Sequence, residues 1–171
     1  MPTPARRPVT VAAVAAAVLL VDQATKFWAE SALTDRAPVE VLGEFLRLRL
    51  LYNPGAAFSI GSGSTWVFTV LAAVAVVVII RFAARPQPTS RAVALALLLG
   101  GASTHLLDRL FRDPGFARGH VVDFIDYNGW FVGNVADIAL TVGVAMIIVL
   151  TVVSPEPDPG AGDQAQAGRS A

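Results

Sequence analysis

The stretch TVLAAVAVVVII, residues 69–80, contains no charged residue and indicates the fold class of the whole chain. It lies within an apolar segment from Trp66 to Ala84, whose length approaches the roughly 20 residues that a membrane-spanning helix requires. A second segment of this kind, Val135 to Val153, ends in the sequence ALTVGVAMIIVLTVV. Because both segments are long and apolar enough to cross a bilayer, each is predicted to be a transmembrane helix.

Two further apolar segments reach this length only when polar residues at one end are included. The first runs from Val9 to about Ala29 and contains Asp22 and Lys26, and the other runs from Ala92 to Leu107. In an up-and-down bundle these polar ends lie at the same membrane face as Asp137, which is close to the start of the last helix. We therefore predict a membrane all-α fold with four transmembrane helices.

The segment between the first two predicted helices has the pattern of a β-strand. From Val39 to Tyr52 the chain is extended in character, and the sequence LRLRL at residues 46–50 alternates leucine with arginine. Alternation with a period of two is typical of a strand that has one apolar face. We predict a small β-sheet here, lying on the membrane between helices 1 and 2; a solvated loop is the alternative.

Composition restricts the chemistry that the chain can carry out. Hydrophobic residues make up 54% of the 171 residues and charged residues 15%, whereas soluble proteins carry about 25% charged residues. The net charge of +0 gives no general attraction for nucleic acid. The absence of cysteine excludes disulfides and thiolate nucleophiles, and two histidines do not suggest a metal site. We expect no metal and no cofactor, and chemistry based on carboxylates, hydroxyls or the backbone.

The two ends of the chain are predicted to lie outside the folded unit. Residues 154–171 are rich in Pro, Gly and polar residues, which predicts a disordered tail after a single domain of residues 1–153. The first apolar segment could instead be a cleaved secretory signal, but no convincing cleavage site follows it. Arginines at the N-terminus and in the segment 81–91 favour the cytoplasm for both termini. The two other connections carry as many arginines, so this count leaves the orientation open.

Three aspartates stand in or beside the apolar segments, where a carboxylate is costly and therefore a candidate for function. They are Asp22, Asp123 and Asp137, of which Asp123 lies in a short hydrophobic patch before the last helix. Two carboxyls in one apolar pocket repel each other, so the pair holds a single proton near neutral pH. One member then serves as base and the other as acid, which is the chemistry of aspartic proteases.

Structural roles are the alternative for each of these acids. Asp137 could cap the last helix, because an aspartate near a helix start accepts hydrogen bonds from free backbone N–H groups. Asp123 could lie in a solvated loop, with Asp126 as its solvated neighbour. Asp22 could simply pair with Lys26 one helical turn away. Spacing in the sequence does not show that Asp123 and Asp137 meet.

Five short motifs resemble those of the bacterial lipoprotein signal peptidases, the signal peptidase II family. They are DQATK (22–26), NPGAAFSI (53–60), GGASTHLLDR (100–109), VVDFID (121–126) and NVADIA (134–139). They correspond to the family's Asp-x-x-Thr-Lys, Asn-x-Gly-Ala-Ala-Phe, Gly-Gly-Ala-x-Gly-Asn-x-x-Asp-Arg, first catalytic aspartate segment and Asn-x-Ala-Asp. Each motif is weak alone, but their order and their places at the ends of four helices make the resemblance specific.

The resemblance extends over roughly residues 9–153 and implies an intramembrane aspartic endopeptidase with Asp123 and Asp137 as the catalytic pair. It implies cleavage of a lipid-modified prolipoprotein on the amino side of its diacylglyceryl-modified cysteine. It also implies a multi-pass protein of the bacterial cell membrane, with both termini in the cytoplasm and the active site near the extracytoplasmic face. We expect a monomer whose partners are this substrate and membrane lipids. The excess of Ala, Val and Arg is typical of a high-GC genome.

Further residues of the motifs are candidates for substrate binding or support. The substrate-binding candidates are Asn53, Gly55, Arg109 and Asn134, and the supporting candidates are Asp22, Lys26, Asp108 and His105. For Asn53 and Asn134 the alternative is turn or cap geometry, and Gly55 could be a simple turn glycine. Arg109 could hold Asp108, Asp22 or a backbone carbonyl, or extend to the membrane interface.

Several positions depart from the family pattern. Where relatives carry Gly-Asn in the third motif, this chain has Thr104 and His105, which leaves the role of His105 open: it could replace the asparagine as a donor. Gly133 stands where an aromatic residue usually precedes the last asparagine. Two other functions remain possible from the residues alone, namely a small proton-coupled transporter that uses the acids as relay groups, and a non-catalytic membrane adaptor.

Overall fold

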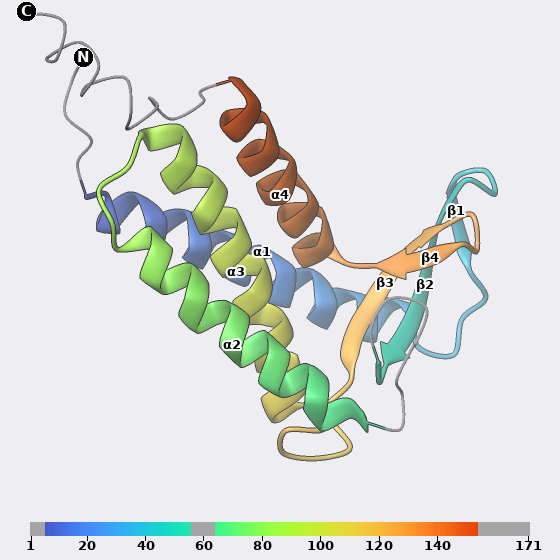
Figure 1. The fold of residues 1–171 in the computed structure, drawn as a ribbon. Helices are drawn as coiled ribbons and strands as arrows, with labels where there is room; N and C mark the ends of the chain where they lie inside the picture. Colours follow the sequence, from blue (N-terminus) through green and yellow to red (C-terminus); the bar gives the residue numbers. More distant parts are fainter. Residues whose placement is uncertain (1–5, 56–63, 154–171) are drawn as a thin grey trace, which may run out of the picture.

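The computed structural model describes residues 6–55 and 64–153, and the predicted tail lies outside this part of the chain. The elements are α1 (Pro8–Leu33), β1 (Val39–Leu42), β2 (Leu46–Asn53), α2 (Thr65–Ala83), α3 (Thr89–Phe111), β3 (Val121–Tyr127), β4 (Phe131–Gly133) and α4 (Val135–Val153). Each of the four helices is long and apolar enough to cross a membrane. The predicted four-helix membrane fold with a small sheet is confirmed (Figure 1).

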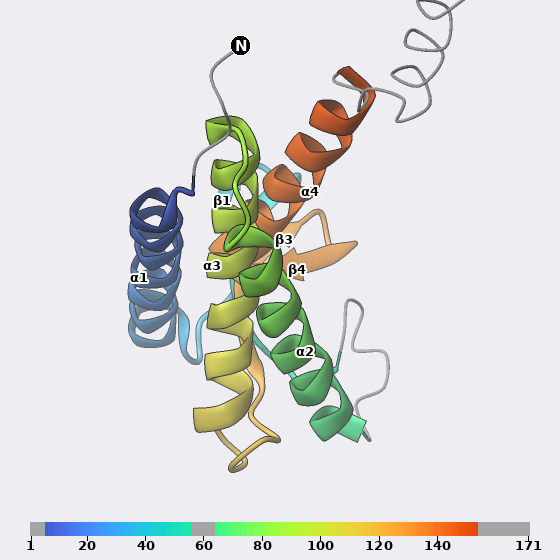
Figure 2. The ribbon, with the colours of Figure 1, turned by 60° about the vertical axis from the view of Figure 1, so that its left-hand side comes forward.

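Helix α3 is the centre of the bundle, and the other three helices pack against it (Figure 2). Two adjacent glycines let two neighbours approach it closely. A Cβ added to Gly100 would lie 2.7 Å from Cβ of Val18 in α1, and one added to Gly101 would lie 2.7 Å from Cγ of Leu140 in α4. The GG pair in the third motif therefore brings α1 and α4 against the same turn of α3.

The sheet is antiparallel, in the order β1-β2-β3-β4, and lies at one end of the bundle (Figure 1). The strand predicted between the first two helices is confirmed, and the connection between α3 and α4 adds β3 and β4 to it. Asp123 therefore lies in a strand, and the prediction that it could lie in a solvated loop is wrong. Strand β3, VVDFIDY, is buried or half-buried along its whole length, so it lacks the alternation of buried and exposed residues of a strand with one open face.

A buried cluster of charges connects α1 to α3. Lys26 is 0% exposed, and its Nζ lies 2.6 Å from Oδ2 of Asp22 and 2.7 Å from Oδ2 of Asp108. The predicted pairing of Asp22 with Lys26 is confirmed, and Asp108 is the third member. Thr104 donates its hydroxyl hydrogen to Asp22, and Gln23 donates to Asp108 at 3.0 Å. Most polar atoms of this cluster are hydrogen bonded within the protein. Such bonding is needed because an unpaired polar group is costly where the dielectric constant is low.

The sheet end of the molecule pairs its arginines with acids. Asp126 is 1% exposed and lies 3.1 Å from Arg47 and 3.5 Å from Arg49, so the prediction that it is a solvated neighbour of Asp123 is wrong. Arg112 lies 2.6 Å from Glu30. The start of α1, the turn between α2 and α3 and the end of α4 lie at the opposite end of the bundle (Figure 1).

Replacing the shared cation tests the buried cluster. Lys26→Met is expected to lower the free energy of unfolding by about 3–5 kcal/mol, because two buried carboxylates lose their common counter-ion. The measurement is denaturant unfolding of the purified protein in detergent. Arg49→Met is the control, since it removes an exposed partner of Asp126 and should cost about 1 kcal/mol or less. Equal losses for the two variants would contradict this interpretation of the cluster.

Candidate active site

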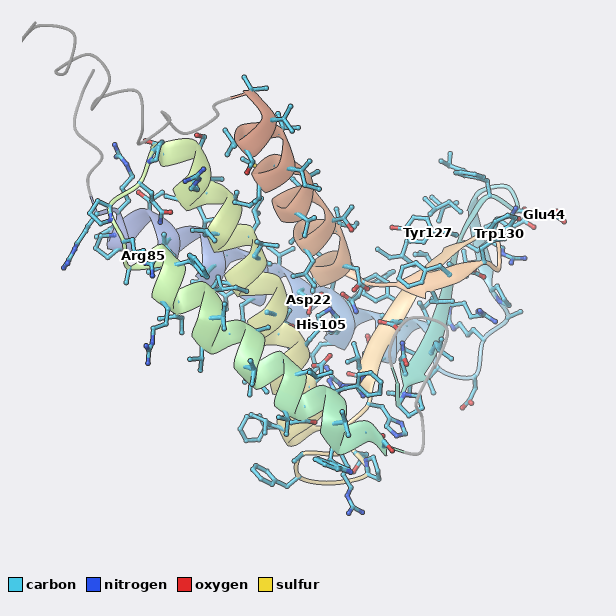
Figure 3. All side chains as sticks on the ribbon, viewed as in Figure 1. Asp22, Glu44, Arg85, His105, Tyr127 and Trp130 are labelled. Atoms are coloured by element: carbon cyan, nitrogen blue, oxygen red, sulfur yellow. The ribbon has the colours of Figure 1, made fainter. Side chains whose placement is uncertain are left out.

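Both aspartates line one cavity where the helices meet the sheet. Its volume is about 250 Å³, and it also contains His105. Figure 3 labels His105 and Asp22 at this junction. Asp123 enters from β3 and Asp137 from the first turn of α4, so the fold joins two residues that are separated by a turn and a strand. The remaining residues that line the cavity are Asn53, Gly55, Phe68, Ala72, Arg109, Val121 and Phe131.

Asn134 is hydrogen bonded to both carboxyls. Its side-chain Nδ2 donates to Oδ1 of Asp123 at 2.7 Å, and its backbone N–H donates to Oδ2 of Asp137 at 2.9 Å. In return, Oδ1 of Asn134 accepts the backbone N–H of Asp137 at 3.1 Å, which completes a reciprocal cap at the start of α4. The capping alternative for Asp137 is therefore present, and it orients the carboxyl group toward the cavity.

The buried charge cluster holds the backbone beside each aspartate. Oδ1 of Asp22 accepts the N–H of Ala136 at 2.9 Å, one residue before Asp137. Oδ2 of Asp108 accepts the N–H of Val122 at 3.4 Å, one residue before Asp123. Since Lys26 bridges the two carboxylates, one cation fixes both backbone positions. The supporting roles predicted for Asp22, Lys26 and Asp108 thus have a geometric basis.

Asp123 is 2% exposed and has a perturbed acidity. Burial is the largest cause, and it raises the pKa of this carboxyl to about 6. Two amides oppose the rise, since Nδ2 of Asn53 donates at 3.0 Å and Nδ2 of Asn134 also donates, whereas the neighbouring charge of Asp137 adds to it. The carboxyl of Asp123 is thus suited to keep a proton into the mildly acidic range.

Asp137 has a more open environment than Asp123. Its side chain is 29% exposed, and Nε2 of His105 lies 3.2 Å from Oδ1. Of the two departures from the third family motif, His105 contacts Asp137 in the cavity, whereas Thr104 donates to Asp22 in the buried charge cluster. His105 is thus a polar neighbour of Asp137, and its replacement of the usual asparagine stays a prediction.

Arg109 shapes the wall of the cavity through backbone carbonyls. It is buried, and its Nη1 donates to the carbonyl oxygens of Asn53 at 3.2 Å, Pro54 at 3.0 Å and Gly119 at 3.2 Å. Its Nη2 donates to the carbonyl of Gly55. Of the predicted alternatives for Arg109, binding of a carbonyl is the one observed. The rest of the second motif, residues 56–60, lies outside the described part of the chain.

Asn53 and Gly55 also have the turn geometry that was considered for them. Oδ1 of Asn53 accepts the N–H of Gly55 at 3.0 Å, and both residues line the cavity. A contact of either residue with substrate stays a prediction. Over residues 6–55 and 64–153, no group of three or more His, Asp and Glu side chains is placed to hold a metal ion.

Phe131 and Gly133 belong to the site although the sequence did not single them out as site residues. A Cβ on Gly133 would lie 2.6 Å from Cε1 of Phe131 and 2.8 Å from Oδ2 of Asp137. The ring of Phe131, stacked on Tyr127 with centroids 6.0 Å apart, therefore occupies the space beside Gly133. The departure from the usual aromatic residue at position 133 was the signal that could have identified this pair.

The model of one family, described as signal peptidase (SPase) II, matches residues 14–153. The chain belongs to the signal peptidase II family. It is 41% identical over 145 residues to a lipoprotein signal peptidase of Rhodococcus jostii (strain RHA1), covering 85% of this chain and 73% of that protein. A lipoprotein signal peptidase of Bifidobacterium longum subsp. infantis is 45% identical, covering 84% of this chain and 79% of that protein. Family membership and the four helices identify a multi-pass membrane peptidase.

Solved structures of similar fold agree with this assignment. A bacterial membrane enzyme structure determined by the in meso method at 2.3 Å resolution has a TM-score of 0.77 and 28% identity, covering 92% of this chain and 99% of that chain. A second, at 1.9 Å resolution, has a TM-score of 0.75 and the same identity and coverage. The similarity therefore covers both the helical bundle and the sheet.

Removing one amide donor tests the environment of Asp123. A donor stabilises the ionised carboxylate, so its loss favours the protonated form; Asn53→Leu is expected to raise the pKa of Asp123 above about 6, by about one unit. The measurement is a pH titration by carboxyl ¹³C NMR of aspartate-labelled protein, with the signal assigned by Asp123→Asn. Gln87→Leu, at the other end of the bundle, should leave this pKa unchanged. An unchanged or lower pKa in Asn53→Leu would contradict the assigned contact.

Proposed function

We propose that this peptidase removes the signal peptide from prolipoproteins by cleaving on the amino side of the diacylglyceryl-modified cysteine. In this proposal Asp123 and Asp137 are the catalytic residues of an aspartic endopeptidase. The observation that supports it most directly is that both carboxyls line one cavity and are joined through Asn134. The names of the relatives support the class of substrate.

The different environments of the two aspartates suggest their roles. The carboxyl of Asp137 accepts hydrogen bonds from its surroundings and is the more exposed, so it acts as the base that takes a proton from water. The resulting hydroxide attacks the scissile carbonyl carbon, while Asp123 gives its proton to the carbonyl oxygen. When the tetrahedral intermediate collapses, the oxygen returns its proton to Asp123, and Asp137 gives its proton to the departing amino group of the cysteine. Water is the only co-reactant.

Binding of the substrate favours this distribution of protons. Burial is the largest cause of the raised pKa of Asp123, and a bound peptide excludes further water from the cavity. The pKa of Asp123 in the complex is therefore higher than the value of about 6 in the free protein. In this proposal Asp123 holds the proton that it gives to the scissile carbonyl oxygen.

The other candidate residues surround the reacting groups. Gly55 leaves room for the substrate backbone, and Arg109 fixes that wall of the cavity through four carbonyl contacts. Asn53 and Asn134 hold the carboxyl of Asp123 toward the substrate. In this proposal the signal helix lies beside the cavity, and the lipid extends between the helices into the bilayer.

We also propose that both termini are cytoplasmic, that the active site is near the extracytoplasmic face, and that residues 1–153 act as a monomeric domain. The arginines support this orientation. At the sheet end, Arg47, Arg49 and Arg112 are paired with acids. At the other end, Arg81, Arg85 and Arg91 have no carboxylate within 4.0 Å among the residues that the structure describes, which suits the anionic cytoplasmic surface. Exposed Phe45 and Trp130 at the turns of the sheet are suited to the outer membrane interface.

The transporter and the adaptor have less support. Asp22, Asp123 and Asp137 lie together at one end of the bundle. A proton relay across the membrane would instead need acids spread along the helices. The similar proteins reported above carry the name of a peptidase, which does not support a transporter.

Substitution of each aspartate tests the mechanism. Asp123→Asn and Asp137→Asn are each expected to lower kcat at least about 100-fold, because each removes one partner in proton transfer. The measurement is mass-spectrometric detection of the cleaved signal peptide from a synthetic precursor that carries a diacylglyceryl cysteine. Asp126→Asn is the control, since it removes a buried carboxylate of the same strand that does not line the cavity, and it should retain activity. Cleavage by Asp137→Asn at the wild-type rate would contradict the proposal.

The position of His105 gives a second prediction. His105→Asn should retain most of the activity, since asparagine can still donate to Asp137 as in the family pattern. His105→Ala should lower kcat by about 10-fold or more, because a hydrogen bond to a charged group is worth roughly 1.5–3 kcal/mol. The rates are compared at saturating precursor with KM determined for each variant. An equal fall in kcat for His105→Asn and His105→Ala would contradict this prediction, because it would mean that the imidazole has a function that an amide does not supply.

A further inference from the structure

A second cavity lies at the end of the bundle away from the active site. Its volume is about 590 Å³, and α2, α3 and α4 each contribute a wall. Ile79, Leu98 and Ile147 make its sides apolar, and Arg85 and Arg91 also line it. Figure 3 labels Arg85 at this end, far from the sheet. None of the residues that line it also lines the active-site cavity, so it is a separate site.

Among the described residues, the two arginines of this cavity have no acidic partner, unlike Arg47 and Arg112 near the sheet. In the described part of the chain, neither Arg85 nor Arg91 has a carboxylate oxygen within 4.0 Å, whereas Arg47 and Arg112 are both paired. The segment 81–107 contains no Asp or Glu at all. Arg85 lies over the ring of Phe82, 5.1 Å from its centroid, which keeps its charge beside the apolar wall. Two cations thus line a cavity with apolar sides.

This combination specifies the chemistry of the ligand. A guanidinium pair binds a phosphate oxygen through several N–H donors, and the apolar walls bury hydrocarbon. Basic pockets between transmembrane helices on the cytoplasmic side bind anionic lipid headgroups. We propose that this cavity binds an anionic phospholipid, with its phosphate at Arg85 and Arg91 and one acyl chain along Ile79, Leu98 and Ile147.

Charge also distinguishes the lipid from another candidate occupant, the signal helix of the substrate. The start of a signal peptide is positively charged, so it would meet two cations of the same sign. A phospholipid phosphate neutralises that repulsion and fills the gap between α2 and α4. The inference does not depend on the peptidase mechanism, because it concerns a cavity at the other end of the bundle.

The experiment measures binding of dioleoyl phosphatidylglycerol to the full chain in a neutral detergent, by native mass spectrometry and by the shift in Tm. Wild-type protein should bind this lipid and be stabilised more than by dioleoyl phosphatidylcholine, which has no net charge. Arg85→Gln combined with Arg91→Gln should weaken phosphatidylglycerol binding about 25-fold, at about fivefold for each basic residue near a lipid surface. The control, Arg81→Gln, removes a neighbouring arginine that does not line the cavity and should bind as the wild type does.

The outcomes separate the occupants. Equal effects of the two lipids on the wild type, or equal losses in Arg81→Gln and in the double variant, would overturn the inference in favour of general attraction to the surface. Loss of binding of a synthetic signal peptide by the double variant in lipid-free detergent would assign the cavity to the substrate instead. If the double variant does not fold, Ile147→Trp provides the second test. The indole ring would fill the space proposed for the acyl chain, so this variant should reduce phosphatidylglycerol binding with both arginines in place.

Discussion

The structure depends on one buried ammonium group. Nζ of Lys26 bridges Asp22 and Asp108, and each of these carboxylates accepts the backbone N–H beside a candidate catalytic residue. Three charges in a low-dielectric environment are tolerated only when they are paired and hydrogen bonded, so this geometry is strongly constrained. The same interaction that joins α1 to α3 also sets the positions of α4 and β3. The same contacts of Lys26, Asp22 and Asp108 therefore stabilise the bundle and align the two aspartates.

The bundle divides its charges between its two ends. At the sheet end, Arg47 and Arg112 are paired with acids, while Asp123 and Asp137 line a cavity. At the other end, the arginines have no acidic partners among the residues that the structure describes, and two of them border an apolar groove. One end is thus suited to proton transfer on a bound peptide, and the other to contact with anionic lipid. The apolar helices between them keep the two environments apart.

The four helices and the strand of residues 46–53 could be predicted because their signals are local, namely apolar length and alternation. Strand β3 could not, because it is buried or half-buried along its whole length and reads as an apolar patch, and Asp126 was therefore taken for a solvated side chain. The aspartate pair was found from the cost of burying carboxylates and from the family motifs. The contacts of Asp22 with Ala136 and of His105 with Asp137 required the fold, since they join residues far apart in the sequence.

The central claim is that the Lys26 cluster positions the carboxyls of Asp123 and Asp137 so that both reach one scissile peptide bond. An experimental structure of Asp137→Asn bound to an uncleaved, lipid-modified precursor tests it most directly. We expect the carbonyl oxygen within about 2.6–3.2 Å of the carboxyl of Asp123 and the carbonyl carbon facing position 137, with the Asp22–Ala136 contact retained. A scissile bond that lies outside this cavity, or that reaches only one of the two positions, would contradict the account.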